Sequence, residues 1–330
     1  MARHEDRRMA LGFPPAKRVS TNGIELEVHE QGEGPLIVLC HGFPEIAYSW
    51  RYQIPALAAA GYRVVAPNQR GYAGSDQPTD VTDYDQFHLI DDLVGLLDHY
   101  GEKDALFVGH DWGALLLWQM ALLKPERMRG LITLNIPFAP RRAIDPMVMT
   151  RQVLGDDFYI INFQDSDEAD RAFEADTERF LEAMYRRLPA TRAAFNQLKP
   201  EQRQAFSMLR EMRKDTFPGT PLLDAEDFQV FVEAFNRSGF TPAINWYRNW
   251  SRNWAMTEGV PQRVDIPTLF IGAEDDILIT PEHVETMRDY VGDLEVHMIA
   301  ECGHWTQQEH PETVNDMMTN WLGKRFPLDR

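Results

Sequence analysis

Residues 105–123 read ALFVGHDWGALLLWQMALL, in which a short apolar run, a glycine-containing turn and a longer apolar segment follow one another. The first run is typical of a buried strand, and the segment after the turn has the length of a helix. The turn GHDWGA (109–114) has the spacing Gly-x-Asp-x-Gly, which is typical of a sharp strand-to-helix turn that lifts its central side chain out of a sheet. Asp111 at that centre is either a reactive carboxylate favoured by the helix N-terminus or an ordinary capping aspartate.

Similar strand and helix patterns lie on both sides of this unit. GIELEVHE (23–30) alternates apolar and polar residues like a half-exposed strand. Compact apolar runs of the buried-strand type are LIVLC (36–40), RVVAP (63–67) and GLITLNI (130–136). Segments with helical spacing stand between these runs. This alternation predicts an α/β fold with a mostly parallel sheet and helices on both faces.

The alternation stops after Ile136 and resumes near residue 264. Residues 137–263 are rich in helix formers and contain no convincing buried strand. PTLFIGAEDD (267–276) and LEVHMIAECGH (294–304) again have strand character. We therefore expect one core, formed by residues 1–136 and 264–330, with residues 137–263 inserted as a helical lid.

The composition excludes several classes of function. The chain carries 51 acidic and 33 basic residues and a formal charge of −18, which argues against nucleic acid or an anionic membrane as a partner. Its two cysteines, Cys40 and Cys302, form no CxxC pair, so we expect buried thiols and no metal site. The N-terminus lacks the apolar core of a signal peptide and no run is long enough to span a membrane, which predicts a cytoplasmic protein.

CHGFPE (40–45) follows the predicted strand LIVLC and predicts a loop that meets the turn at Asp111. In such a loop the backbone N–H of Phe43 can face a developing oxyanion, and the N–H of Trp112 can be the second donor. Phe43–Pro44 is a candidate cis peptide bond. The alternative is a plain turn without catalytic meaning.

Two further strand ends carry groups that complete an acid–base pair. GAEDD (272–276) offers Glu274, Asp275 and Asp276, and CGHW (302–305) offers His304. Ends of parallel strands meet at one edge of a sheet, where an acid could orient the imidazole as a general base. A structural histidine and a solvated acidic loop are the alternatives. The order Asp111, acid, histidine is that of α/β-hydrolases.

A carboxylate nucleophile favours a particular reaction. Asp111 is ionised near neutral pH and needs no base to activate it. It would displace a leaving group from an sp3 carbon and form an alkyl ester, which water activated by His304 would then hydrolyse. The scheme suits a strained or good leaving group and does not suit carboxylic esters or amides.

At this point the chain resembles the epoxide hydrolases of the α/β-hydrolase superfamily over nearly its whole length. The matching stretches are HGFPE (41–45), QRGYAGSD (69–76), GHDWGA (109–114), FYIINFQ (158–164), SGFTPAINWYRNW (238–250), AEDD (273–276) and ECGHW (301–305). The resemblance implies an eight-stranded, mostly parallel sheet with an inserted helical lid, no cofactor and no metal.

The resemblance also implies roles for individual residues. Tyr159 and Tyr247 match the two lid tyrosines that protonate or hydrogen-bond the epoxide oxygen, although both could be lid-core aromatics. Asp276 matches the acid that partners the base, and Glu45 could help to position water or serve a structural role. His110 is expected to point away from the site.

The hypothesis is therefore an enzyme that adds water to a small, apolar, uncharged epoxide and yields a vicinal diol, acting as a monomer or homodimer. A haloalkane dehalogenase with the same aspartate and histidine is the alternative. Relatives that act on fluoroacetate place arginine after the nucleophile, where this chain has Trp112. A non-catalytic binding protein is a third hypothesis, and it has little support because every catalytic position is filled.

Overall fold

The seven strands predicted from sequence patterns and one further strand, β1, form one sheet of eight strands in the order β1-β2-β4-β3-β5-β6-β9-β10. The computed structural model describes residues 12–187, 191–197, 199, 207–277 and 280–328. The pairs β1–β2 and β2–β4 are antiparallel and the other pairs are parallel, so the prediction of a mostly parallel sheet is confirmed. The strands are β1 (Ala16–Thr21), β2 (Ile24–Gln31), β3 (Leu36–Cys40), β4 (Arg63–Asn68), β5 (Ala105–His110), β6 (Met128–Leu134), β9 (Thr268–Ala273) and β10 (Leu294–Ile299).

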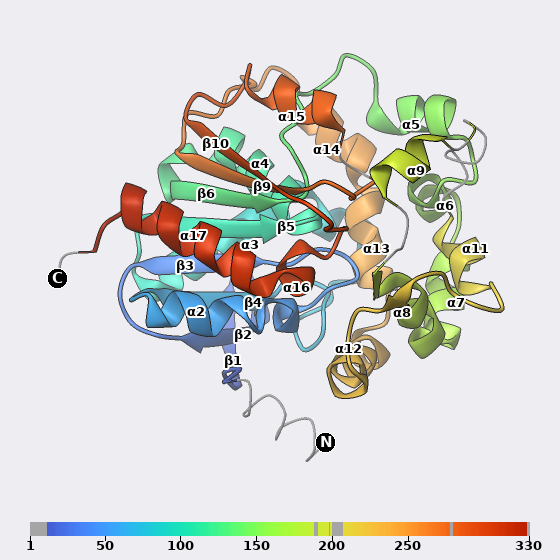
Figure 1. Cartoon of the computed structure of the whole chain (residues 1–330), viewed down its shortest axis with the longest axis horizontal. Coiled ribbons are helices and arrows are strands. Elements are labelled where there is room, and N and C mark those ends of the chain that lie inside the picture. Colours follow the sequence, from blue (N-terminus) through green and yellow to red (C-terminus); the bar gives the residue numbers. More distant parts are fainter. Residues whose placement is uncertain (1–11, 188–190, 198, 200–206, 278–279, 329–330) are drawn as a thin grey trace.

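Helices cover both faces of this sheet: α2 and α17 lie on one face, and α3 and α4 on the other (Figure 1). The bounds of α3 follow from its sequence, because the Asp85 carboxylate accepts the N–H groups of Phe87 and His88, and Gly101 ends the helix with a φ of 72°. The core helices are α2 (Gln53–Ala59), α3 (Gln86–Tyr100), α4 (Trp112–Leu123), α15 (Pro281–Met287), α16 (Thr306–Glu309) and α17 (Pro311–Arg325), with 3-10 turns η1 (Ala47–Trp50), η2 (Val81–Tyr84) and η3 (Pro125–Arg127).

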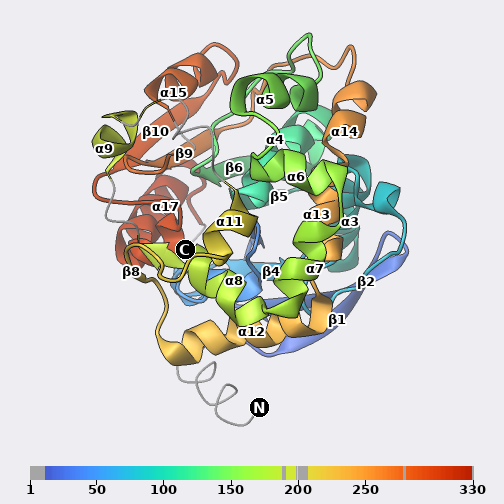
Figure 2. The same cartoon turned by 90° about the vertical axis from the view of Figure 1, so that its right-hand side faces the viewer.

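The chain between β6 and β9 is predominantly helical, and its helices gather over one side of the sheet (Figure 2). Strand content in its described residues is limited to a pair of two-residue strands, β7 (Arg186–Arg187) and β8 (Thr220–Pro221), which agrees with the absence of a predicted buried strand there. The helices are α5 (Pro146–Leu154), α6 (Tyr159–Asp165), α7 (Glu168–Ala175), α8 (Thr177–Met184), α9 (Arg192–Gln197), α11 (Met208–Met212), α12 (Ala225–Ser238), α13 (Thr241–Arg248) and α14 (Trp250–Met256).

An aromatic cluster holds this helical segment together. The rings of Phe173 on α7 and Phe180 on α8 stack with centroids 3.8 Å apart, and Phe235 and Phe240 stack at 4.6 Å. All four side chains are fully buried, and burial of a phenylalanine side chain is worth roughly 1.5–3 kcal/mol. The segment therefore has an apolar centre of its own.

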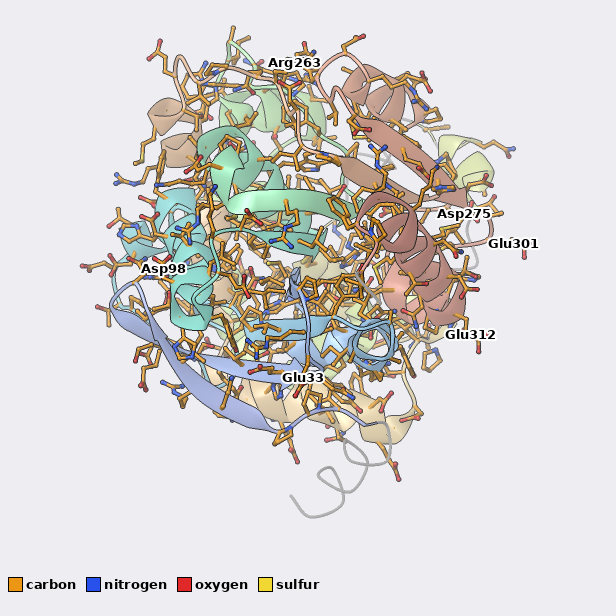
Figure 3. The ribbon with its side chains drawn as sticks, turned by 90° about the vertical axis from the view of Figure 1, so that its left-hand side faces the viewer. Glu33, Asp98, Arg263, Asp275, Glu301 and Glu312 are labelled. Carbon is orange, nitrogen blue, oxygen red and sulfur yellow. The ribbon has the colours of Figure 1, made fainter. Side chains whose placement is uncertain are left out.

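Acidic side chains lie on well-separated parts of the surface, as the labelled Glu33, Asp98 and Glu312 illustrate (Figure 3). Among the described residues, no helix is long and apolar enough to cross a membrane. Cys40 and Cys302 are buried free thiols, as the sequence predicts.

Candidate active site

The turn after β5 holds Asp111 in a strained backbone conformation with φ 50° and ψ −118°. Positive φ in a residue other than glycine costs on the order of 1–3 kcal/mol and occurs chiefly where the surroundings enforce it. Gly113 is required here, because a Cβ atom at this position would overlap the carbonyl oxygen of Cys40. Asp111 occupies the N-cap position of α4, yet its side chain makes no capping hydrogen bond. The carboxylate is thus presented beyond the sheet instead of being used by the helix.

The loop after β3 donates a hydrogen bond to one oxygen of the Asp111 carboxylate. The N–H of Phe43 donates to Asp111 Oδ1 at 2.9 Å. The register of β3 and β5 pairs Cys40 with Gly109, which brings the loop against the turn, and a Cβ atom on Gly42 would overlap Asp111. The predicted cis peptide bond between Phe43 and Pro44 is present.

Trp112 is the first residue of α4, so its N–H belongs to the helical turn that has no preceding carbonyl partner within the helix. Its indole ring lies 4.8 Å from the ring of Tyr247, centroid to centroid. The role of the Trp112 peptide N–H as a second oxyanion donor stays a prediction.

His304 lies between two carboxylates. Its Nδ1 is 2.8 Å from Asp276 Oδ2, and its Nε2 is 3.7 Å from Asp111 Oδ2. Since Asp276 is fully buried and holds Nδ1, the Nε2 atom is the one that faces Asp111. Among the three acids of GAEDD, Asp276 is the one that bonds the imidazole.

Two opposing influences act on the protonation of His304. Burial lowers its pKa, but the carboxylates of Asp276 and Asp111 outweigh that effect and raise the pKa from 6.5 to about 9. The raised pKa favours the protonated imidazole near neutral pH.

Asn135 is a site residue that the sequence pattern did not single out. Its side-chain amide donates to Asp276 Oδ2 at 2.7 Å, and its backbone has a φ of 66° directly after β6. The signal available in the sequence was an asparagine at a strand end, a residue type that tolerates positive φ better than most. Asn135 therefore holds Asp276 in place, and Asp276 in turn holds His304.

Tyr159, the first residue of α6, and Tyr247 on α13 bring two phenols from the helical segment to Asp111. Their ring centroids lie 6.0 Å apart, and Tyr247 also lies 5.4 Å from the Phe43 ring. Burial, together with the nearby negative charge of Asp111, raises the pKa of both phenols far above neutral pH. Both phenols therefore remain protonated and able to donate.

One cavity of about 260 Å³ joins these groups. The predicted site residues that line it are Phe43, Asp111, Tyr159, Tyr247, Asp276 and His304. Its other lining residues are mixed, with apolar side chains such as Pro44, Met184, Met208, Ile277 and Trp305 and charged ones such as Arg186, Arg187, Glu211, Asp275, Glu301 and Glu309. Asp275 and Glu301 are labelled together at one edge of the molecule in Figure 3. Glu45 and Trp112 are not among the residues that line it.

Glu45 lies behind this lining and is fully buried. Its Oε2 accepts the N–H of Gly42 at 2.9 Å and lies 2.6 Å from His110 Nδ1. Burial opposes ionisation, but His110 and the Gly42 N–H outweigh it and lower the Glu45 pKa to about 2. His110 Nε2 in turn donates to the carbonyl oxygen of His304 at 2.8 Å, so His110 links Glu45 to the loop of the base.

The chain as a whole is similar to several known proteins. A family model described as alpha/beta hydrolase fold matches residues 35–311. Epoxide hydrolase A of Mycobacterium tuberculosis is 39% identical over 94% of this chain and 98% of its own length. Bifunctional epoxide hydrolase 2 of Sus scrofa is 37% identical, and the match covers 91% of this chain and 53% of that protein. The crystal structure of epoxide hydrolase A from Mycobacterium thermoresistibile superposes with a TM-score of 0.84 at 39% identity, covering 94% of this chain and 98% of that one.

Proposed function

The chain belongs to the epoxide hydrolases of the α/β hydrolase family, and from that membership we propose how its own residues convert an epoxide and water into a vicinal diol. The relatives give no support to the alternative of a haloalkane dehalogenase. We assign the core to residues 1–136 and 264–330 and the lid to residues 137–263, which carries both tyrosines.

Ring opening begins at Asp111. Oδ1 is held by the Phe43 N–H, so Oδ2 attacks an epoxide carbon, forms the ester bond and breaks the carbon–oxygen bond of the ring. Tyr159 and Tyr247 donate hydrogen bonds to the leaving oxygen. One phenol passes its proton to that oxygen, which becomes the first hydroxyl of the diol, and the proton that His304 gives up on alkylation restores the phenol. A phenol suits this task because it donates without being ionised beforehand.

Hydrolysis of the ester follows at the Asp111 carboxyl carbon. His304 Nε2 takes a proton from water as the water oxygen attacks, and Asp276 orients the ring and stabilises the imidazolium. The N–H groups of Phe43 and Trp112 hold the oxyanion. Collapse breaks the bond between the carboxyl carbon and Oδ2. Oδ2 takes the proton of the newly added hydroxyl and leaves as the second hydroxyl of the diol, which returns Asp111 to a carboxylate beside protonated His304.

The charge of Asp111 acts as a switch for His304. In the free enzyme that charge helps to hold the imidazole protonated. Alkylation converts the carboxylate into a neutral ester, which lowers the His304 pKa and releases a neutral base when hydrolysis requires one.

The observation that carries this proposal is the single cavity lined by Asp111, His304 and both lid tyrosines. A single turnover with excess enzyme in H2 18O tests it. Both oxygens of the first diol would come from the epoxide and from Asp111, so we expect no 18O in that diol and 18O in later ones. A first-turnover diol that carries 18O would show direct attack by water on the epoxide.

For the substrate class we propose a small, uncharged, largely apolar epoxide. Aromatic and methionine side chains supply much of the cavity wall, and the carboxylates among its other charged residues outnumber the arginines, which disfavours an anion. A panel of styrene-type, aliphatic and carboxylate-bearing epoxides beside a haloalkane, scored for diol and halide, tests this. Preference for the carboxylate-bearing epoxide, or release of halide, would contradict it.

A further inference from the structure

Arg51 is a buried cation outside the active-site cavity, and it lies where three segments of the chain meet. It follows η1 in the core, its Nε donates to Asp227 Oδ2 on lid helix α12 at 2.9 Å, and its Nη1 donates to Gln308 Oε1 on α16 at 2.8 Å. The side chains of Arg51 and Asp227 are each 3% exposed. A charge this deeply buried is stable only with such partners.

The chemistry of Arg51 fixes the orientation of Gln308. A guanidinium only donates, so the Gln308 carbonyl oxygen must face Arg51. The Gln308 amide nitrogen is thereby turned toward Glu45, and it donates to Oε1 at 3.3 Å beside the Gln307 amide, which donates at 2.8 Å. Without Arg51 the amide could flip and present an oxygen to the Glu45 carboxylate.

Glu45 connects the oriented Gln308 side chain with the loop of His304. Its Oε2 receives a hydrogen bond from His110 Nδ1 at 2.6 Å, and His110 Nε2 donates to the main-chain oxygen of His304 at 2.8 Å. Both ring nitrogens of His110 thus face acceptor oxygens, one of Glu45 and one of the His304 main chain. This arrangement requires that the Glu45 oxygen accepts a hydrogen bond. A continuous buried path of hydrogen bonds connects the lid carboxylate of Asp227 with the loop that carries the base.

We propose that Arg51 is a positioning residue for the hydrolysis half of the reaction, acting through Gln308, Glu45 and His110 on the placement of His304. The proposal rests on the function proposed above. Ring opening depends on Asp111, whose Oδ1 is held by the Phe43 N–H, and on the lid tyrosines, so we expect Arg51 to affect ester hydrolysis more than ring opening.

A buried ion pair with a merely structural role would behave differently, and the chain offers a matched control. Arg70 and Asp92 form a second buried ion pair, with side chains 3% and 4% exposed, at distances of 2.6 and 2.7 Å. Both residues lie in the core, before η2 and on α3, and none of their side-chain hydrogen bonds among the described residues reaches Glu45 or His110. Loss of Arg70 therefore reports the cost of an unpaired buried carboxylate without disturbing the path to His304.

Rapid-quench single turnovers of the parent, Arg51→Met, Gln308→Leu and Arg70→Met test the proposal, with formation and decay of the Asp111 ester measured separately at a temperature where each variant is folded. A displacement of 1 Å at a reacting group can cost about 100-fold, so we expect roughly tenfold slower ester decay in Arg51→Met and Gln308→Leu, with ester formation changed by less than about twofold. Arg70→Met should leave the ratio of the two rates unchanged.

Equal changes in both steps, or no change in ester decay, would overturn the proposal. If Arg51→Met does not fold, Gln308→Leu decides alone, because Gln308 lies in the core and carries no charge. A parent enzyme that forms no ester would overturn the proposed function itself and this proposal with it. An ester that decays normally in the variants would overturn only the role of Arg51.

Discussion

Replacing Asp111 with asparagine should lower the pKa of His304. Asparagine keeps the shape of the side chain and an oxygen that can accept the Phe43 N–H, but it removes the negative charge beside His304 Nε2. This variant therefore reproduces, without substrate, the neutralisation of Asp111 that ester formation brings about. It isolates the switch that turns His304 into a base.

The expected size follows from the distance between the two groups. At 3.7 Å the attraction between unit charges is about 1 kcal/mol at the dielectric constant of water and about 4.5 kcal/mol at an effective value of about 20. One pH unit corresponds to about 1.4 kcal/mol, so the His304 pKa should fall by roughly 1 to 3 pH units. From about 9 in the parent, a fall of this size raises the fraction of neutral imidazole near neutral pH, and at the upper end of the range most of the imidazole is neutral.

The measurement is a titration of the His304 ring by long-range 1H–15N NMR in the parent and in Asp111→Asn. Asp275→Asn serves as the control, because Asp275 lines the same cavity and lies beside Asp276, while its carboxylate accepts the backbone N–H of Arg192 and not the imidazole. The control should titrate like the parent. A His304 pKa that is equal in all three proteins would refute the switch.

Three further results are expected. Replacing Tyr159 or Tyr247 with phenylalanine should slow ester formation by roughly 100-fold each in single turnovers, because a donor to the developing alkoxide is lost; unchanged rates would show that these rings only pack. Because the folded pKa of His304 is raised to about 9 from 6.5, its stabilising contribution is complete below pH 6.5 and is lost as pH rises to about 9, so the parent should lose stability across that window and His304→Gln should lose less of it; parallel curves would contradict this. Gly113→Ala should lower the free energy of unfolding by roughly 1–3 kcal/mol in urea melts, since its Cβ overlaps Cys40; unaltered stability would show that the turn can shift.

Much of the fold was predictable because its signals are local. The apolar runs at LIVLC and RVVAP became β3 and β4 within one residue at either end. GLITLNI was placed two residues late, since β6 begins at Met128 and ends at Leu134. The strand ends there because Asn135 has a positive φ, and its side chain is needed for a contact with Asp276 that lies far away in the sequence.

The acid–base groups were also accessible to sequence reasoning, since each follows a strand and parallel strands end at one edge. The residues that hold these groups in place could not be predicted in this way. The structural contact of His110 with the His304 main chain was not predicted, nor was the contact of Arg51 with Gln308 across 257 positions of sequence. Such pairs have no local signal, because tertiary packing alone brings them together.

The helical segment between β6 and β9 shows the same limit. The segment SDEADRAFEADTERFLEAMYRRL is rich in helix formers, and the structure forms two helices from it, α7 and α8, which are separated at Asp176. The Asp176 side chain accepts the N–H of Arg179 and begins the second helix. A capping residue within a stretch rich in helix formers marks a possible break between two helices. Whether the chain breaks there depends on what the two helices pack against.

The central claim is that Asp111 becomes covalently attached to the substrate, and His304→Gln tests it most directly. Glutamine cannot serve as the base, so the ester should form and then persist. After mixing with an epoxide that the parent turns over, mass spectrometry of proteolytic fragments should find the peptide containing Asp111 heavier by the mass of the intact epoxide. An unmodified Asp111 peptide, or an adduct on any other residue, would contradict the covalent mechanism.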